Sequence, residues 1–520
     1  MGTSAPGLMP LDFAALQRQL RPEWGREDRC SLADVDVLVV PSLSLEPSAL
    51  ALVTGAHHYE ERQLFALSRL RDPGVRMVYV TSKLLPELVV DAVLELLPGV
   101  PAAHARRRLQ LFDTDDASER PLSAKLLERP ALLARLREQL RPGRSFMLTY
   151  NVTPLEKLLS EKLQIPLFGT DPALQWWGTK AGARDLFQRL AIPHPPGSAL
   201  VHDLASLAEA TADLWERLPS LRRCVVKLNE GFSGEGNALL PLEPLDLAEH
   251  CPRERRRVLL EALQELPMPA AHWIEQMAQQ GALVEAWLEG GLEVRSPSMQ
   301  GAILPEGEVV VLSTHEQVLG GATGQTYLGC EFPAHREYRR ALMDHGRAVG
   351  RELGKQGALE RYSVDFLARQ GPGGWDLQAI EVNLRQGGTT HPFMALHALT
   401  TGELDGESGL YRAPTGDGLY YLATDNFCDP SLRGLLPFDL VDIVADAGLH
   451  YDQARLQGTV FHLLGCLSQY GKIGMTSIGR SRGQARTVYE ATQAQLIKGA
   501  QLRHDIDLNG STIAHALPTR

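Results

Sequence analysis

The chain has 520 residues, a formal net charge of -11 and a hydrophobic content of 44 %. A chain of this length exceeds what one hydrophobic core usually serves, so we expect three or four domains. The negative charge argues against a nucleic-acid partner, because duplex binding depends on neutralising phosphates with Lys and Arg. The basic runs at 106–108 and 253–257 are interpreted as solvated faces, since neither lies among aromatic residues or in a basic domain.

Cysteine usage and hydropathy indicate the cellular setting. The cysteines form no C-x-x-C pair and accompany no histidine cluster at zinc spacing, which predicts reduced thiols and a cytoplasmic location. No apolar run approaches the length that spans a bilayer, and the first twenty residues lack the pattern of a signal peptide, so we expect no membrane association. The cysteines are Cys30, Cys224, Cys251, Cys330, Cys428 and Cys466.

The first 170 residues alternate short apolar strands with amphipathic helices, a pattern typical of a parallel sheet. We assign this segment no chemistry of its own. The expected strands lie at 35–41, 75–81 and 145–150, and the expected helices lie at 60–70, at 86–97 and in a segment that ends at Leu163.

Residues 171–192 are predicted to form a helix that carries Lys180 near its middle and stops at Pro193. A helix at 203–218 and a strand at 223–228 follow, and together they indicate a small α+β lobe. Taken alone, Lys180 would be interpreted as a surface lysine.

The strand at 223–228 carries Lys227 and leads into a loop that contains Gly231, Gly234 and Gly236. Such a loop can bring backbone N–H groups close to phosphate oxygens, because glycine permits close approach and positive φ. It is neither a Walker loop nor a Rossmann fingerprint, since here the lysine precedes the glycines. A glycine-rich turn between two strands would have the same sequence, so that interpretation stays open.

Residues 283–294 (LVEAWLEGGLEV) are predicted to form an apolar strand that ends in a glycine turn. This segment suits a hinge whose backbone reads an adenine edge, although a plain strand and turn would look alike. Further strands and a helix near 334–355 are expected before residue 401.

The run Glu381-Val382-Asn383-Leu384-Arg385 places a carboxylate, an amide and a guanidinium on one face of a predicted strand. Asp365, in the apolar strand 362–367, offers a second carboxylate. Hard oxygen ligands from non-adjacent segments can hold Mg²⁺, which requires the two strands to be neighbours in one sheet. The alternative is the solvated face of an edge strand.

After residue 401 the sequence is rich in glycine, which predicts a linker or loop before a last domain. That domain is expected to end in a helix whose apolar stripe packs against the rest of the domain. The stripe consists of Ala485, Val488, Tyr489, Thr492 and Leu496.

In this order the motifs resemble the ATP-grasp family. The resemblance implies that ATP binds through Lys180, Lys227, Gly231, Ser233, Gly234, Gly236, Glu285, Trp287, Leu288 and Glu293. Lys180 and Lys227 would contact phosphates, Glu285 and Leu288 would flank the adenine, and Glu293 would bind the ribose. The resemblance also implies that Asp365, Glu381 and Asn383 hold Mg²⁺, as two ions or with Mn²⁺ as a substitute. Arg385 would be catalytic and face an acyl phosphate.

A narrower similarity, to peptide ligases of the pheganomycin type, lies in residues 293–333, 381–392 and 458–490. It implies a multidomain α/β and α+β fold. The expected parts are a Rossmann-like pre-ATP-grasp domain at 1–170, a small ATP-grasp lobe at 171–282, a large lobe with the magnesium site at 283–404 and a C-terminal α+β domain at 405–520.

The implied activity is an ATP-dependent carboxylate–amine ligase that works through an acyl phosphate. An amino-acid-derived acid would be the donor and an amino acid or peptide the nucleophile, with small-molecule substrates as the partners; a homodimer is compatible with the sequence. A phosphotransferase that stops at an acyl phosphate and a nucleotide-binding scaffold are the alternatives. His315, Glu316 and His391 are candidates for the general base, and a buried structural role is the alternative for the two histidines.

Overall fold

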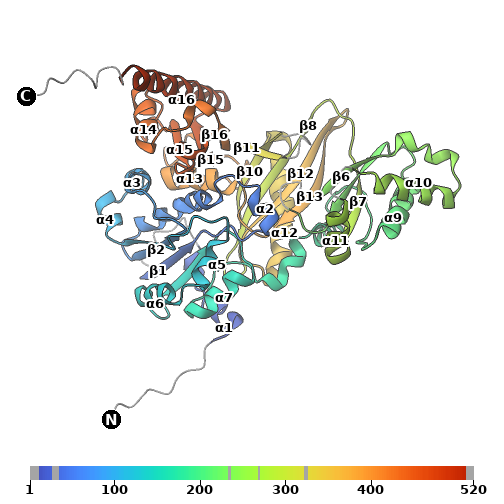
Figure 1. The fold of residues 1–520 in the computed structure, drawn as a ribbon, viewed down its shortest axis with the longest axis horizontal. Coiled ribbons are helices and arrows are strands. Elements are labelled where there is room, and N and C mark those ends of the chain that lie inside the picture. The colour runs from blue at the N-terminus through green and yellow to red at the C-terminus, as the bar shows by residue number, and fades with distance from the viewer. Residues whose placement is uncertain (1–10, 26–33, 232–235, 267–269, 321–325, 511–520) are drawn as a thin grey trace, which may run out of the picture.

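The computed structural model describes residues 11–25, 34–231, 236–266, 270–320 and 326–510. Figure 1 shows an elongated molecule with a large sheet at its centre. The N-terminal α/β region and the C-terminal region lie together on one side of this sheet, and a small lobe extends from the other side.

The N-terminal region is a parallel sheet of four strands in the order β3-β2-β1-β4, as the alternation of strands and helices predicts. Its strands are β1 (Val35–Val40), β2 (Val75–Thr81), β3 (Leu109–Asp113) and β4 (Ser145–Thr149). The helices around it include α3 (Glu87–Glu95), α5 (Leu122–Leu127), α6 (Pro130–Gln139) and α7 (Pro154–Leu163). The helix expected at 60–70 is part of a longer 3₁₀ helix, η2 (Ala56–Arg71).

The small lobe is an antiparallel sheet in the order β6-β5-β7, covered by helices. The apolar core between the sheet and the helices includes Val226, Leu207 and Leu259, each fully buried. The strands are β5 (Arg223–Leu228), β6 (Asn237–Pro241) and β7 (Ala282–Ala286), and the helices are α9 (Leu204–Arg217), α10 (Pro252–Gln264) and α11 (Ala270–Gln280).

The single helix expected at 171–192 is wrong, because the segment divides into η3 (Pro172–Gly178) and α8 (Lys180–Arg189). Thr179 between them has extended backbone, with φ -83° and ψ 163°, and its hydroxyl accepts a hydrogen bond from the Gly182 N–H at 3.1 Å. This is an N-cap, which satisfies a backbone donor at the start of α8. Lys180 therefore opens a helix instead of lying in the middle of one.

Among the described residues, the central sheet has eleven strands. The helix α12 (Arg336–Lys355) packs on β9 and β10, and its Gly346 and Gly350 lie close to the sheet: a Cβ at Gly350 would lie 2.2 Å from the Tyr362 hydroxyl. The first strands of the sheet are β8 (Val294–Arg295), β9 (Pro297–Ile303), β10 (Val309–Gly320), β11 (Thr326–Phe332), β12 (Glu360–Gly371) and β13 (Gly374–Asn383). The helix α13 (Thr390–Thr400) follows β13.

The C-terminal region continues this central sheet. The expected linker after residue 401 contains the hairpin of β14 (Glu403–Leu404) and β15 (Tyr411–Arg412), and β16 (Gly418–Cys428) then pairs with β11. The final helix α16 (Arg482–Gly510) packs on β16 and β18, and four members of its predicted stripe are buried while Tyr489 is partly buried. The remaining elements include β17 (Gly458–His462), β18 (Lys472–Gly479), α14 (Pro437–Asp446) and α15 (Cys466–Tyr470). The boundaries of the four expected domains stay a prediction.

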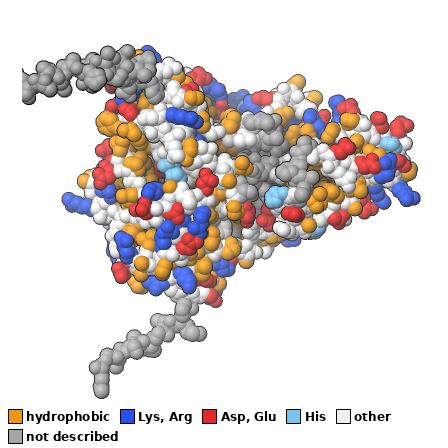
Figure 2. Space-filling view, viewed as in Figure 1, with side chains coloured by type: hydrophobic (Ala, Val, Ile, Leu, Met, Phe, Trp, Pro, Cys, Tyr) orange, Lys and Arg blue, Asp and Glu red, His pale blue; other side chains and the backbone are white. Residues whose placement is uncertain are grey.

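Three further features concern the surface charges, the helices and the cysteines. On the face in Figure 2, Lys and Arg side chains are interspersed with Asp and Glu side chains. Within the described segments, no helix combines the length and the apolar character that crossing a bilayer requires. Of the cysteines, Cys30 lies outside the described residues, and the other five are free thiols.

Candidate functional site

A cavity of about 1240 Å³ lies where the four regions of the chain meet. Lys227 and Glu285 line it from the small lobe, and Asp365 and Glu381 line it from the central sheet. The N-terminal region contributes η2 and Tyr150, and the C-terminal region contributes residues of β16 and β18. Every part of the fold therefore reaches this one cavity.

The strands β12 and β13 form an antiparallel pair that sets the polar floor of the cavity. The register places Asp365 opposite Glu381 and Ser363 opposite Asn383. The Asn383 amide donates to Asp365 Oδ2 and to Glu381 Oε1, both at 3.2 Å. Val382 is 1 % exposed and packs in the opposite layer. The prediction that the two acidic strands are neighbours in one sheet is confirmed.

The two facing carboxylates interact strongly with each other. Burial and the neighbouring Glu381 raise the pKa of Asp365. Burial also acts to raise the pKa of Glu381, but the charge and hydrogen bond of Lys180 prevail and lower it. Two carboxylates and an amide are hard oxygen donors that fit Mg²⁺, whose charge would relieve the repulsion between them. Among the described residues, no group of three or more His, Cys, Asp or Glu side chains is placed to hold a metal ion.

The start of α8 brings Lys180 to this floor. Lys180 Nζ forms an ion pair with Glu381, although the two residues are 201 positions apart in sequence. The Lys180 N–H donates to the carbonyl of Asn229 and the Ala181 N–H donates to the Asn229 side chain, both at 3.0 Å. These bonds join the first turn of α8 to the residue that follows β5.

Lys227 and Arg184 hold Glu285 between them. Lys227 Nζ lies 2.5 Å from Glu285 Oε2, and Arg184 Nη1 lies 2.9 Å from Glu285 Oε1. Glu285 is 2 % exposed, and burial acts to raise its pKa, but the two cations prevail and lower it. Sequence reasoning missed Arg184, which the i, i+4 spacing from Lys180 on one helix face could have indicated.

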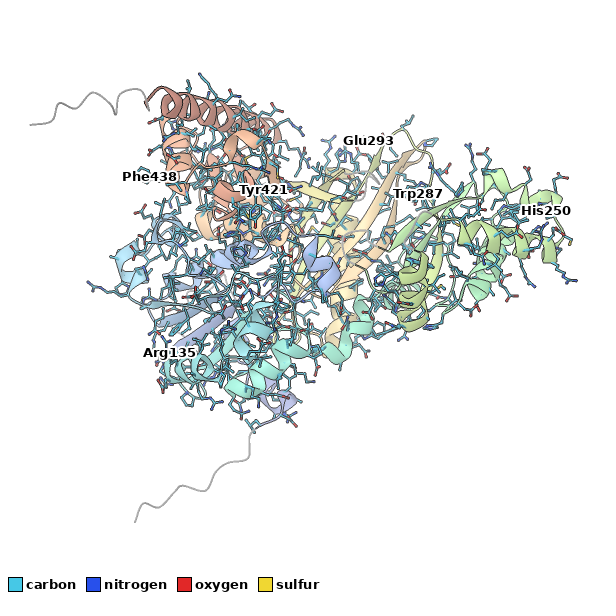
Figure 3. All side chains as sticks on the ribbon, viewed as in Figure 1. Arg135, His250, Trp287, Glu293, Tyr421 and Phe438 are labelled. Atoms are coloured by element: carbon cyan, nitrogen blue, oxygen red, sulfur yellow. The ribbon has the colours of Figure 1, made fainter. Side chains whose placement is uncertain are left out.

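Trp287 and Leu288 line the cavity in the turn after β7, and the hinge role assigned to this turn stays a prediction. The Trp287 N–H donates to the Arg223 carbonyl at 3.3 Å, and the Arg223 guanidinium lies 5.6 Å from the centre of the Trp287 ring. Figure 3 shows Trp287 at the junction between the small lobe and the central sheet. These contacts hold the turn after β7 against β5 of the small lobe.

Glu293 is not among the residues that line the cavity, although its neighbour Val294 is. It is exposed at the edge of the central sheet (Figure 3), and its carboxylate pairs with Arg295 Nε at 2.7 Å. Glu289, in the same turn as Trp287, does line the cavity. The ribose contact assigned to Glu293 stays a prediction, and Glu289 is a second carboxylate within reach of the cavity.

The glycine loop joins β5 to β6, which pair antiparallel. Gly236 has φ +76° and its carbonyl accepts from the Leu228 N–H at 3.1 Å, so the far end of the loop needs glycine. Gly231 is exposed at the near end. The predicted contacts of Ser233 and Gly234 lie outside the described residues.

Arg385 lines the cavity just beyond β13. Its guanidinium donates to Asn383 Oδ1 at 3.0 Å and to the Gln386 carbonyl at 3.2 Å. Gln386 in turn donates to the Thr149 carbonyl at 3.1 Å, and its N–H donates to the Tyr150 carbonyl at 3.2 Å. The N-terminal sheet thus holds the segment that presents Arg385.

Sequence reasoning also missed the part of the cavity wall made by the N- and C-terminal regions. No motif in the sequence around these residues marks any of them as part of a site. Long-range folding alone brings them together. They are Tyr59, Arg62, Tyr150, Asp425 and Lys472.

The three candidates for a general base are not among the lining residues. His315 is fully buried with its Nε2 2.6 Å from the Tyr421 hydroxyl, and burial lowers its pKa to about 3. His391 is buried with its Nδ1 2.6 Å from the Arg62 carbonyl, and burial lowers its pKa to about 3. Glu316 accepts hydrogen bonds from the backbone N–H of His335 and from Tyr338. These positions indicate packing roles.

The burial of His315 predicts a loss of stability in mild acid. Its pKa falls from 6.5 to about 3 on folding, so below pH 6.5 the unfolded chain binds a proton that the native chain excludes. Above pH 6.5 His315 is neutral in both states and does not lower the free energy of unfolding. Below pH 6.5 this free energy decreases by about 1.4 kcal/mol per pH unit. The measurement is the unfolding temperature by calorimetry between pH 7 and pH 5.

His315→Gln should reduce this pH dependence, because the substituted side chain does not titrate. His450→Gln is the matched control, since His450 is exposed, and it should keep the wild-type dependence. Equal slopes for wild type and His315→Gln would contradict the expectation.

Comparison with known proteins gives matches of sequence and of fold. A family described as "IQCH-like, ATP-grasp" matches residues 172–267, and one described as "PGM1 C-terminal domain" matches residues 439–492. The chain is 31 % identical over 446 residues to L-propargylglycine–L-glutamate ligase of Streptantibioticus cattleyicolor, covering 84 % of this chain and 89 % of that protein.

There are also more distant matches, one of sequence and one of fold. IQ motif-containing protein H of Danio rerio is 24 % identical over 479 residues, which cover 82 % of this chain and 45 % of that protein. The crystal structure of the biotin carboxylase–beta-gamma-ATP complex from Campylobacter jejuni has a TM-score of 0.53 and 14 % identity, covering 90 % of this chain and 95 % of that chain. These matches confirm the multidomain α/β and α+β fold expected from the sequence.

Proposed function

The chain belongs to the ATP-grasp ligases, and from this premise we propose how its cavity activates an acid and joins it to an amine. It is an ATP-dependent carboxylate–amine ligase that releases ADP and phosphate. The observation that carries the proposal is the gathering of Lys180, Lys227, Arg385 and the two facing carboxylates around one cavity. The named substrates of the 31 % identical relative are amino acids. We propose an amino-acid-derived acid as donor and an amino acid or peptide as nucleophile.

A carboxylate resists attack by an amine until one of its oxygens becomes a phosphate leaving group. Phosphoryl transfer depends mainly on positioning and on charge, because little covalent chemistry falls to the protein. Lys180 and Lys227 would hold the phosphates of ATP. Asp365, Glu381 and Asn383 would hold Mg²⁺, which offsets the negative charge of the transferring phosphoryl group when it is bound.

Arg385 would act after the phosphoryl transfer. A guanidinium is always charged and can pair in a bidentate way with the acyl phosphate and then with the oxyanion of the tetrahedral intermediate. Its bonds to Asn383 and to the Gln386 carbonyl would keep it next to the metal ligands during both steps. Fixed donors of this kind stabilise charge as it develops.

The remaining contacts with ATP are proposed from the family pattern. The adenine would lie against the hinge, and the ribose would meet Glu293 as predicted from the sequence or Glu289, which lines the cavity. We propose two Mg²⁺ ions, with Mn²⁺ as a substitute, and a cytoplasmic location, where the free thiols stay reduced. The proposed ATP-binding residues are Lys180, Lys227, Gly231, Ser233, Gly234, Gly236, Glu285, Trp287, Leu288 and Glu293.

We also propose a homodimer, supported by apolar side chains that α14 leaves at the surface. Leu436, Phe438 and Val441 are 58, 60 and 38 % exposed, and Figure 3 shows Phe438 at the outer edge of the C-terminal region. Light scattering should give about twice the chain mass of 57.1 kDa, and Phe438→Glu should bring it down to one chain. A wild-type mass of one chain at every concentration would end this proposal.

Glu381→Gln should leave the fold intact and strongly reduce turnover. The substitution keeps the shape of the side chain but takes away the charge that pairs with Lys180 and would hold the metal ion. ADP formation at saturating Mg²⁺ should fall by about two orders of magnitude, as when a preorganised charge in an active site is removed. Glu403→Gln, at an exposed position of β14, is the control. Near-wild-type ADP formation by Glu381→Gln would show the metal assignment to be wrong.

A trapping experiment separates a ligase from a phosphotransferase. With ATP and a suitable amino acid as donor but without an amine nucleophile, hydroxylamine should trap the acyl phosphate as a hydroxamate. Addition of the amine should replace the hydroxamate by an amide. Arg385→Ala should lower both products by about two to three orders of magnitude, the loss typical when an oxyanion partner is removed.

The outcome of that experiment decides among the alternatives. Hydroxamate without amide across a broad panel of amino acids and peptides would favour the phosphotransferase. If no condition yields ADP, the scaffold is favoured.

A further inference from the structure

Two cations from opposite ends of the chain meet in the cavity wall. Arg62 lies on η2 of the N-terminal region, and Lys472 begins β18 of the C-terminal region. Both line the cavity, with the Arg62 side chain 8 % exposed and Lys472 5 % exposed. Figure 1 shows the two regions side by side, and an ion pair of 3.5 Å between Arg62 and Asp425 of β16 joins them.

Lys472 has no counter-charge among the described residues. Its Nζ donates to the Tyr59 hydroxyl at 2.7 Å and lies 5.0 Å from the centre of the Tyr59 ring. An ammonium group has three donors, so this contact leaves two of them for another acceptor. Burial and the nearby Asp425 raise the pKa of Tyr59, so its hydroxyl stays protonated.

The other charged groups nearby are already engaged. Asp425 pairs with Arg62, and Glu61 accepts from the Gly465 N–H at 3.0 Å and lies 3.5 Å from His58. His462 stays neutral, because burial, together with His391 and the two cations, lowers its pKa well below 6.5.

Arg62 has donor capacity left as well. It donates to the Gly387 carbonyl at 3.3 Å, but its buried Nε has no hydrogen-bond partner. Its guanidinium lies 5.4 Å from the Tyr59 ring and 6.0 Å from the Tyr150 ring, which form the apolar sides of this part of the wall. Among the residues that line this part of the cavity, Arg62 and Lys472 carry positive charges and Asp425 carries a negative charge, so one positive charge is in excess.

A buried cation is costly unless an anion with hydrogen-bonding capacity pairs with it. The cavity wall therefore suits a negatively charged ligand group between Lys472 and Arg62. The phosphates of ATP have their own cations in Lys180 and Lys227, and the reacting carboxyl group has Arg385. The anion that is left is a carboxylate which does not take part in the reaction.

We propose that Lys472 and Arg62 bind the non-reacting carboxylate of an amino-acid substrate. This inference rests on the proposed ligase function and adds a specificity determinant to it. Lys472 lies within residues 439–492, so the C-terminal segment supplies a substrate contact and the site is incomplete without it. The carboxylate belongs either to the nucleophile or to the donor, and the experiment separates these sources.

The test compares acids with their amides. A matrix of the proteinogenic L-amino acids as donors and nucleophiles first identifies the pair with the fastest ADP-linked amide formation. The α-carboxylate of the nucleophile, and the second carboxylate of the donor where the donor has one, are then replaced in turn by a carboxamide. With wild-type enzyme, one of the two replacements should lower kcat/KM by about 10- to 100-fold, the range expected when a hydrogen bond to a charged group is lost. The partner whose amide is poor carries the recognised carboxylate.

Lys472→Met connects that loss to the lysine. The variant should lower kcat/KM for the acid by a similar factor and leave kcat/KM for the amide within about threefold of wild type, because the two changes remove the same contact. Lys472→Arg should restore most of the preference for the acid. Lys355→Met is the control, since Lys355 is an exposed lysine paired with Glu352, and it should change neither value.

Several outcomes would overturn the inference. If wild-type enzyme had the same kcat/KM for each amide as for the corresponding acid, the inference would be overturned. This result needs no variant, so it holds even if Lys472→Met does not fold. Equal losses for acid and amide in Lys472→Met would show a structural role instead. If Lys472→Met still joined the substrates and kept the wild-type preference for the acid, this subsite would be rejected and the ligase function would stand. If wild-type enzyme formed no ADP with any pair, both proposals would be rejected.

Discussion

The repulsion between Asp365 and Glu381 is the constraint on which the rest of the site depends. The register of β12 and β13 places the two carboxylates face to face, and partial burial strengthens their interaction. A compensating charge is required, and Lys180 supplies it from the first residue of α8. The Thr179 cap fixes that helix start, so a local feature of the sequence sets the position of a charge at the centre of the cavity.

The same requirement for paired charge links the separate regions of the chain. Glu285 is held by Lys227 and Arg184, so the strands β7 and β5 and the helix α8 share one buried network. Breaking one member of such a network leaves an uncompensated buried charge. The contacts of Gln386 with β4 extend the connection to the N-terminal sheet. Polar contacts between regions therefore fix the positions of the residues around the cavity.

Local patterns in the sequence predicted those features that depend on a few neighbouring residues. The alternation of side chains along β13 predicted that Glu381 and Asn383 share one face of the strand. The apolar run before the glycines predicted the strand β5, which carries Lys227. The prediction that Lys180 lies in the middle of a helix was wrong. The residues on both sides of Thr179 have helical character, so the sequence did not show that Thr179 separates two helices. Lys472 could not be predicted, because an isolated lysine at the start of a strand acquires meaning only when β18 joins the central sheet next to η2.

The buried ion pairs of this cavity are better explained by function than by stability. Replacing a buried ion pair by apolar residues of similar volume is often neutral or stabilising, so selection for stability alone does not maintain one. Here the charged groups converge on a single cavity, whereas the cores around Val226 and Val382 are built from apolar side chains. Groups with perturbed pKa values that gather in a cleft indicate a reaction site. Asp365, Glu381 and Glu285 have shifted pKa values and all line this cavity, which supports the proposal that the cavity is the reaction site.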